Sequence, residues 1–159
     1  MPPRTRAKGL MENDKELVLL LGEEFAERYE LLGDLGSGSF GRVIKARQRT
    51  TGQLVAIKIL RLAPLRRGSE GSGRVERFRR ELRLCSELSH PNIVRLIDSG
   101  TATDGSLYAV LEFVPGMTLR DVLDAEQKLS VRETMHLMTQ VLDALSCAHT
   151  RGVVHRDLK

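Results

Sequence analysis

The stretch Gly36-Ser37-Gly38-Ser39-Phe40-Gly41-Arg42-Val43 decides the fold of this 159-residue chain. Glycines at this spacing let a backbone turn come close to a ligand, and the free N–H groups of such a turn can bind phosphate oxygens. The same spacing opens a helix in dinucleotide-binding proteins, but here strand-like sequence follows, and Thr51-Gly52 predicts a hairpin turn. The motif therefore predicts a loop between two strands, which is either a phosphate-binding loop or an ordinary hairpin turn.

The sequence on either side of these glycines predicts an α+β fold in which strands come first and helices last. Runs of strand-forming residues bounded by glycine and proline turns predict strands over residues 29–35, 42–47, 54–60, 94–99 and 107–114. One helix is expected among the strands, over residues 74–88, and two follow them, over residues 118–123 and 130–150. The last helix begins with a predicted capping box of Ser130 and Glu133.

The charge of the chain is mildly basic, with a formal net charge of +4 and a pI near 9.4. Much of the excess comes from arginines between residues 61 and 83. Such a cluster is typical of a solvated face beside a phosphate-handling site, and a basic helix is also able to touch nucleic acid. Aromatic residues make up only 4% of the chain, which argues against base-stacking platforms. We therefore expect no nucleic-acid partner.

The sequence has no apolar run of about 18 residues, so we expect no membrane-spanning segment in it. The apolar stretch 17–21 is too short for the core of a signal peptide and is followed by two glutamates. A cytoplasmic location is the default expectation. In a reducing compartment Cys85 and Cys147 are expected to be buried thiols, and their spacing fits no metal site.

Lys58 lies in the apolar strand expected over residues 54–60, where successive side chains point to opposite faces. It shares its face with Ala56, while Val55 and Ile57 belong to the opposite face. A lysine in so apolar a strand needs an anionic partner to offset its desolvation, and both a phosphate and a carboxylate qualify. The alternative is a lysine on an exposed edge strand, which needs no partner.

Glu81 is the candidate carboxylate partner. In the helix expected over residues 74–88 it lies at the border of the apolar face. From that position its carboxylate can point inward at Lys58. The alternative is a surface ion pair with Arg77, worth only a few tenths of a kcal/mol.

The last five residues, His155-Arg156-Asp157-Leu158-Lys159, follow a short extended run after the final expected helix. A carboxylate at Asp157 can accept a proton from a hydroxyl nucleophile, and Lys159 can neutralise a phosphate during transfer. Taken alone, a His-Arg-Asp triplet is a chance match in most proteins. The interpretation therefore depends on the glycine-rich stretch and on Lys58.

Together these stretches resemble the eukaryotic-type serine/threonine protein kinase family, and its bacterial members in particular, from about Tyr29 to Lys159. His90-Pro91-Asn92-Ile93-Val94 and Leu111-Glu112-Phe113-Val114 look like further landmarks of that family.

The resemblance also implies a domain organisation. Residues 28–114 are expected to form the small lobe, with a five-stranded antiparallel sheet, one helix and the hinge. Residues 115–159 are expected to form the start of a larger helical lobe. Residues 1–27 remain as a partly disordered N-terminal extension of unknown purpose, in which one amphipathic helix is expected over residues 14–27.

The resemblance implies a site for ATP and Mg²⁺, with separate groups of residues for each part of the nucleotide. The residues that match the phosphate-binding groups are Gly36, Gly38, Gly41 and Lys58, the last paired with Glu81. The residues that match the adenine site are the apolar lining Leu35, Val43 and Ala56, the gatekeeper Leu111, and the hinge Glu112 to Val114, which bonds adenine through its backbone.

For catalysis, the resemblance matches Asp157 to the catalytic base and Lys159 to the lysine that contacts the γ-phosphate. A lysine after Asp157-Leu158 resembles the serine/threonine subclass, so the implied substrate is a protein with serine or threonine hydroxyls. Arg156 resembles the arginine of kinases that are switched on by phosphorylation of their activation loop.

The family's magnesium ligands, an asparagine of the catalytic loop and the aspartate of an Asp-Phe-Gly motif, would follow residue 159. We therefore assign no metal ligand within residues 1–159, and expect a polypeptide of these residues to be inactive alone. The apolar stripe of the last expected helix should then stay uncovered. Two alternatives remain: a non-catalytic fragment that binds ATP or another protein, and a small-molecule phosphotransferase of the same fold, against which the hinge and Arg-Asp-Leu-Lys residues argue.

Overall fold

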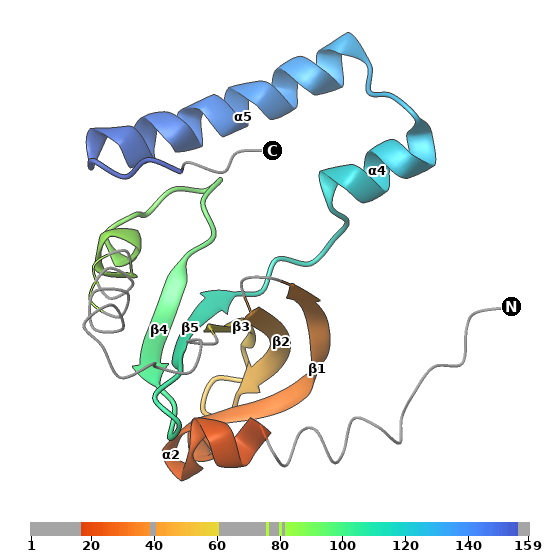
Figure 1. Ribbon diagram of the computed structural model, residues 1–159. Helices are drawn as coiled ribbons and strands as arrows, with labels where there is room; N and C mark the ends of the chain where they lie inside the picture. Colours follow the sequence, from red (N-terminus) through yellow and green to blue (C-terminus); the bar gives the residue numbers. More distant parts are fainter. Residues whose placement is uncertain (1–16, 39–40, 61–75, 77–79, 81, 156–159) are drawn as a thin grey trace, which may run out of the picture. The chain divides into compact units, whose positions relative to one another are not determined.

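The computed structural model describes residues 17–38, 41–60, 76, 80 and 82–155. Contacts within the chain define two compact units (Figure 1), which are Met1–Phe78 with Leu96–Phe113, and Arg79–Arg95 with Val114–Lys159. The first unit holds the sheet and the second holds the long helices.

The described residues of the first unit form an antiparallel sheet of five strands. These strands are β1 (Tyr29–Gly38), β2 (Gly41–Gln48), β3 (Leu54–Leu60), β4 (Leu96–Thr101) and β5 (Leu107–Glu112). They lie in the order β1-β2-β3-β5-β4. The predicted α+β fold with a five-stranded antiparallel sheet is confirmed, and β3 has its predicted bounds.

The other four strands differ from their predicted bounds. β1 and β2 extend farther toward the glycine loop, because their ladder continues to the Gly38–Gly41 pair. β5 ends at Glu112, earlier than predicted, because its ladder with β3 ends at the Val55–Glu112 pair. β4 begins at Leu96, later than predicted, because residues 91–93 form a turn closed by a 3.1 Å hydrogen bond to the His90 carbonyl.

The hydrophobic core lies on one face of this sheet. Alternation in β3 puts Val55, Ile57 and Ile59 on this face, where each is at most 3% exposed. Ile57 pairs with Ile44 on one side and with Val110 on the other, and both partners are fully buried. Branched apolar side chains pack well on a pleated surface, and burial of each contributes about 1.5–3 kcal/mol.

Two short helical segments precede β1. Residues 17–21 are helical, and α2 (Glu23–Arg28) follows them. The single helix expected over residues 14–27 is therefore divided, and the division falls at Gly22. Its φ of 95° lies in a region that glycine adopts at little cost and that interrupts a helix.

Residues 17–28, which we call the N-terminal segment, belong to the core of the sheet. Leu21 and Phe25 are 4% and 3% exposed and pack in the core cluster. The Thr103 hydroxyl donates to the Leu20 carbonyl over 2.7 Å, and the Thr103 N–H donates to the same carbonyl over 2.8 Å. The turn between β4 and β5 thus satisfies a carbonyl that the short helix leaves without a partner.

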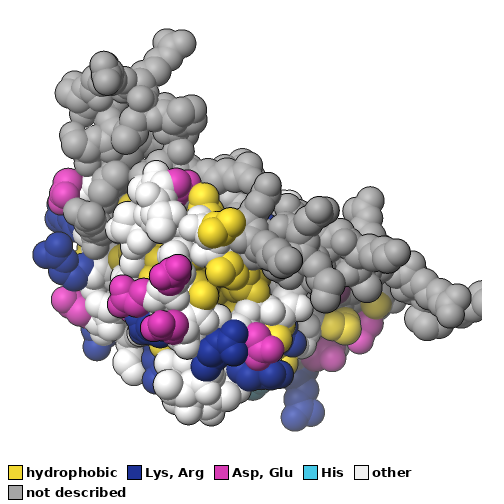
Figure 2. Space-filling view, turned by 90° about the horizontal axis from the view of Figure 1, so that it is seen from below, with side chains coloured by type: hydrophobic (Ala, Val, Ile, Leu, Met, Phe, Trp, Pro, Cys, Tyr) yellow, Lys and Arg dark blue, Asp and Glu magenta, His cyan; other side chains and the backbone are white. Residues whose placement is uncertain are grey.

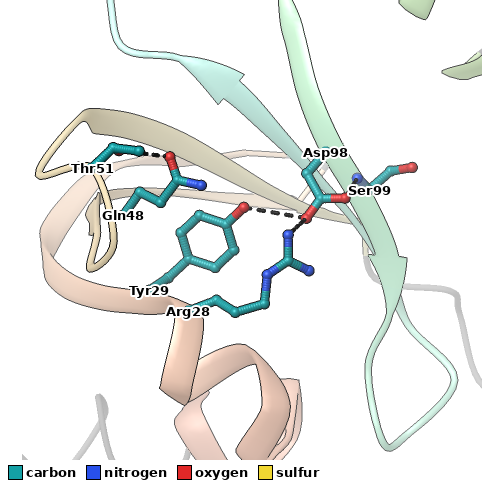
Figure 3. Close-up of polar contacts among 6 residues, drawn as sticks. All are labelled: Arg28, Tyr29, Gln48, Thr51, Asp98 and Ser99. Atoms are coloured by element: carbon teal, nitrogen blue, oxygen red, sulfur yellow. Dashed lines mark hydrogen bonds and ion pairs between the residues drawn. The ribbon is translucent and has the colours of Figure 1, made fainter.

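Polar contacts fasten α2 and the start of β1 to the far strand β4 (Figure 3). Arg28 Nη2 donates to Asp98 Oδ2 over 2.6 Å, and the Tyr29 hydroxyl donates to the same oxygen over 3.2 Å. Burial, and then the charge of Asp98, raise the pKa of Tyr29 to about 12. In the turn between β2 and β3, the Thr51 hydroxyl donates to Gln48 Oε1 over 2.8 Å.

Acidic and basic side chains are interspersed over the face shown in Figure 2, with hydrophobic side chains between them. In the sheet unit, oppositely charged neighbours pair with each other, as Arg47 does with Glu30 at 3.2 Å. Interspersed charges of both signs are typical of a solvated surface. Among the described residues visible in Figure 2, side chains of one sign do not form an extended region.

In the second unit, α4 (Leu119–Glu126) begins at a capping box of Thr118 and Asp121. It runs past its predicted end at Leu123. It stops where Gln127 takes a left-handed backbone conformation with a φ of 66°, a common way for a helix to end.

The long helix α5 (Val131–Thr150) begins at the predicted capping box. The Glu133 N–H donates to Ser130 Oγ over 3.2 Å, and the Ser130 N–H donates to Glu133 Oε2 over 2.8 Å. Among the described helices, none combines the length and the apolar character that crossing a bilayer requires.

In the second unit, the predicted exposure of the α5 stripe agrees with the structure, and the predicted burial of the two cysteines does not. The apolar stripe of α5 is largely uncovered, as expected: Met135, Met138 and Leu142 are 66%, 43% and 59% exposed, and its fourth member, Leu145, is half-buried. The expectation of two buried thiols is wrong. Cys85 is exposed, because it lies in the exposed last turn of its helix, and Cys147 is half-buried on α5.

Candidate functional site

The face of the sheet opposite the core carries most of the described residues that the sequence singled out. On β3, Ala56 and Lys58 are half-buried, whereas their neighbours Val55 and Ile57 are fully buried. The predicted alternation is therefore confirmed. Lys58 projects from the face that points away from the core.

The strand register brings residues from four strands together on this face, because directly paired residues of neighbouring strands point to the same side. One row of paired residues runs through Gly36, Val43, Lys58 and Ala109. The adjacent row runs through Gly33, Lys45, Ala56 and Leu111. We call this surface the open face of the sheet.

Gly36 has open space around it. A Cβ built on Gly36 would meet no heavy atom within 4 Å, so packing within the described chain does not require glycine at this position. Gly41, which pairs with Gly38 at the end of the ladder, has a φ of 126°, where a side chain is disfavoured. Backbone conformation thus explains the glycine at 41, whereas neither contacts with described residues nor a positive φ requires glycine at 36.

An ion pair joins the two strands that flank these glycines. Arg42 Nη2 donates to Asp34 Oδ2 over 2.7 Å, and Arg42 Nε donates to Asp34 Oδ1, so the contact is bidentate. These hydrogen bonds hold the pKa of Asp34 below its ordinary value. The pair keeps β1 and β2 together close to the tip of the glycine loop.

The chain leaves the sheet after β5, at the segment expected to form the hinge. Glu112 and Phe113 are half-buried, and Val114 is 62% exposed. Lys45 Nζ lies 4.3 Å from the centre of the Phe113 ring, within the range of a cation–π contact. Leu35, the remaining residue of the expected apolar lining, is 46% exposed on β1.

Three predicted site residues, Glu81, Asp157 and Lys159, lie outside the described residues. Their roles and the pairing of Glu81 with Lys58 therefore stay predictions. Within the described ranges, no group of three or more His, Cys, Asp or Glu side chains is placed to hold a metal ion.

The register adds three residues to the open face that the sequence motifs do not single out, Gly33, Lys45 and Ala109. Alternation along β2 gives a signal for Lys45, because it follows Val43 by one full period of a strand. No local pattern gives a signal for Ala109. Its place depends on the pairing of β3 with β5, which are far apart along the chain.

Comparisons with known proteins match this chain over most of its length. Residues 29–159 match the model of the protein kinase domain. The chain is 38% identical to the serine/threonine-protein kinase pkn3 of Myxococcus xanthus over 139 residues, which are 87% of this chain and 25% of that protein. It is 37% identical to the serine/threonine-protein kinase PrkC of Bacillus subtilis over 141 residues, which are 89% of this chain and 21% of that protein. The chain thus spans a quarter or less of the length of these relatives.

Proposed function

Because this chain belongs to the protein kinase family, we propose that residues 29–159 form the ATP-binding part of an enzyme that phosphorylates proteins on serine and threonine. The names of its relatives support the serine/threonine class. One observation carries the proposal, the register that gathers Gly36, Val43, Ala56 and Lys58 on one face of the sheet.

The phosphates of ATP fit the end of the open face that carries the glycines and Lys58. Backbone N–H groups of a glycine-rich turn bind phosphate oxygens, and Gly36 leaves the necessary space open. Among the residues described, Lys58 makes no ion pair. A phosphate would offset the desolvation of its half-buried ammonium group, and we propose Glu81 as the carboxylate that orients it.

The adenine fits the hinge end of the same face. Leu35, Val43, Ala56 and Leu111 would supply small apolar surface for the ring, as is typical of ligand pockets. The backbone after β5 would supply the polar partners. Residues 113–115 belong to no strand or helix, so the N–H groups of Phe113 and Val114 and the C=O groups of all three residues are not committed to the ladder; Pro115 has no N–H.

We assign the transfer step to residues outside the described ranges. Asp157 would accept the proton of the substrate hydroxyl, and Lys159 would contact the γ-phosphate. The lysine after Asp157-Leu158 favours serine and threonine over tyrosine as substrates. Mg²⁺ is expected with ATP, and we assign it no ligand in this chain.

We also propose a cytoplasmic location and an inactive 159-residue polypeptide. The cytoplasm supplies ATP and keeps thiols such as Cys85 reduced. Inactivity is tested with purified polypeptide, radiolabelled ATP and a generic basic protein substrate. Sustained transfer that disappears in Asp157→Asn would show that these residues are sufficient for catalysis and that this part of the proposal is wrong.

Nucleotide binding by the 159-residue chain tests the proposed site. In calorimetric titrations the wild-type chain is expected to bind ATP, and Lys58→Met is expected to weaken binding by about tenfold or more, equivalent to about 1.4 kcal/mol. Lys128→Met is the matched control, because Lys128 is an exposed lysine outside the sheet unit. A wild-type chain that does not bind ATP, or equal affinities in the two variants, would contradict the assignment.

A further inference from the structure

We propose that Lys45 is a positioning residue for nucleotide recognition, which holds the hinge residue Phe113 through a cation–π contact and so sets the affinity for the adenosine part of ATP. The inference rests on the function proposed above. Lys45 Nζ lies 4.3 Å from the centre of the Phe113 ring, well inside the limit of about 6 Å for attraction of a cation to a ring face.

Lys45 stands at the hinge end of the open face. It pairs directly with Ala56, and Ala56 pairs with Leu111, so the three residues share one side of the sheet. Lys58 belongs to the adjacent row, which contains Gly36. The two lysines therefore serve opposite ends of the proposed nucleotide site, Lys58 beside the glycines and Lys45 beside the hinge.

The neighbours of Lys45 leave its side chain free to reach the hinge. The next residue on the same side of β2, Arg47, pairs in the ladder with Glu30 and forms an ion pair with it at 3.2 Å. The residue paired with Lys45 on β1 is Gly33, which offers neither charge nor bulk. The Lys45 ammonium group therefore lies over the face of the Phe113 ring.

Phe113 is the first residue after β5, so strand hydrogen bonds do not fix its backbone. Glu112 is the last residue of β5 and pairs with Val55, while residues 113–115 belong to no strand or helix. The orientation of the peptide groups around Phe113 therefore depends on what its side chain contacts. A ring held by Lys45 fixes the backbone groups on either side of it, which are the proposed partners of adenine.

The alternative role for Lys45 is a direct contact with the phosphates of ATP. Adenosine, which has no phosphates, distinguishes this role from the contact with Phe113. If Lys45 acts through Phe113, Lys45→Met weakens the binding of adenosine and ATP by the same factor, about two- to fivefold, the range for one cation–π contact. If Lys45 contacts phosphate, Lys45→Met weakens the binding of ATP and leaves that of adenosine unchanged.

The test is a set of calorimetric titrations of the full chain with ATP and with adenosine. We expect Lys45→Met and Phe113→Leu each to weaken both ligands by about two- to fivefold. The double variant should be no weaker than either single variant, because both changes remove one contact. Lys45→Arg should retain wild-type affinity, and Lys128→Met serves as the control for loss of a lysine elsewhere.

The outcomes distinguish this inference from the proposed function. A wild-type chain that binds neither ligand overturns both. Wild-type binding that Lys45→Met leaves unchanged, a loss confined to ATP, or additive losses in the double variant overturn the inference alone. If Lys45→Met does not fold, the ring-current shift of the Lys45 Cε protons in nuclear magnetic resonance spectra decides. The shift is expected in the wild type and absent in Phe113→Leu, and its absence from the wild type overturns the contact.

Discussion

The Tyr29 hydroxyl donates a hydrogen bond of 3.2 Å to Asp98 Oδ2 and thereby joins β1 and β4, the two edge strands of the sheet. Side chains therefore span the distance between the two edges of the sheet at the start of β1 (Figure 3). The same carboxylate accepts from Arg28 over 2.6 Å and from the Ser99 N–H over 2.9 Å. One side chain thus fastens the N-terminal segment and the first strand to the far edge.

Asp98→Ala is expected to lower the free energy of unfolding by about 1–3 kcal/mol, because it leaves the buried Tyr29 hydroxyl without its partner. Arg28 loses its ion pair as well, but this arginine is partly exposed and adds little. Urea denaturation measures the change. Asp143→Ala on the exposed side of α5 is the control, and equal stabilities of the two variants would count against the role of Asp98.

The raised pKa of Tyr29 predicts a loss of stability in alkali. Burial, first, and Asp98, second, raise this pKa from 10.0 to about 12, so the folded state holds the phenolic proton more tightly than the unfolded state does. The stabilising contribution is therefore complete below about pH 10 and is lost as the pH rises toward about 12. Urea denaturation at a series of alkaline pH values should show this decline, and Tyr29→Phe should reduce it.

Tyrosinate absorbance checks the same prediction directly. The chain contains two tyrosines, Tyr29 and Tyr108, and no tryptophan, so the signal in the folded protein comes from these two groups alone. Burial also raises the pKa of Tyr108, and Tyr29→Phe leaves that group as the only signal. A wild-type titration that is complete near pH 10 would refute the raised value for Tyr29.

The parts of the fold and site that could be predicted depend on residues close together in the sequence. Alternation within β3 predicts the side on which Lys58 lies, because the period of two belongs to any strand. The capping box of Ser130 and Glu133 spans one helical turn. The glycine loop and its flanking strands are also local. Each of these features is therefore visible before any tertiary contact is known.

The parts that could not be predicted depend on contacts between distant residues. The N-terminal segment has the periodicity of one helix, and the hydrogen bonds from Thr103 to its Leu20 carbonyl depend on the distant turn between β4 and β5. The contact of Lys45 with Phe113 likewise requires β2 and the end of β5 to be placed in one sheet. No periodic pattern within one segment carries that information.

The N-terminal segment supplies a matched pair of leucines that tests its place in the core. Leu21 is 4% exposed and Leu19 is 75% exposed. Leu21→Ala is expected to destabilise the protein by about 2–5 kcal/mol, because it removes a buried side chain and leaves a cavity. Leu19→Ala should change stability by less than about 0.5 kcal/mol. Thermal or urea denaturation of the two variants compares them, and similar losses would mean that the segment is not part of the core.

Substitutions at Gly100 and Gly36 distinguish a glycine required for packing from a glycine required for ligand binding. Gly100 pairs with Tyr108, and a Cβ built on Gly100 would overlap the Tyr108 ring. Gly100→Ala is therefore expected to destabilise the protein by about 1–3 kcal/mol, the typical cost of overpacking. Because Gly100 is not part of either row of the open face, the folded fraction of this variant should bind ATP with wild-type affinity.

Gly36→Ala is expected to behave in the opposite way. Its Cβ would enter empty space, so the free energy of unfolding should stay the same or rise by less than about 1 kcal/mol. The added methyl group would occupy room that the phosphates need, and ATP affinity should fall by about tenfold. Denaturation and calorimetric titration of the same preparation measure both quantities. Gly36→Ala with undiminished ATP affinity would show that the open space above this glycine is not where the nucleotide binds.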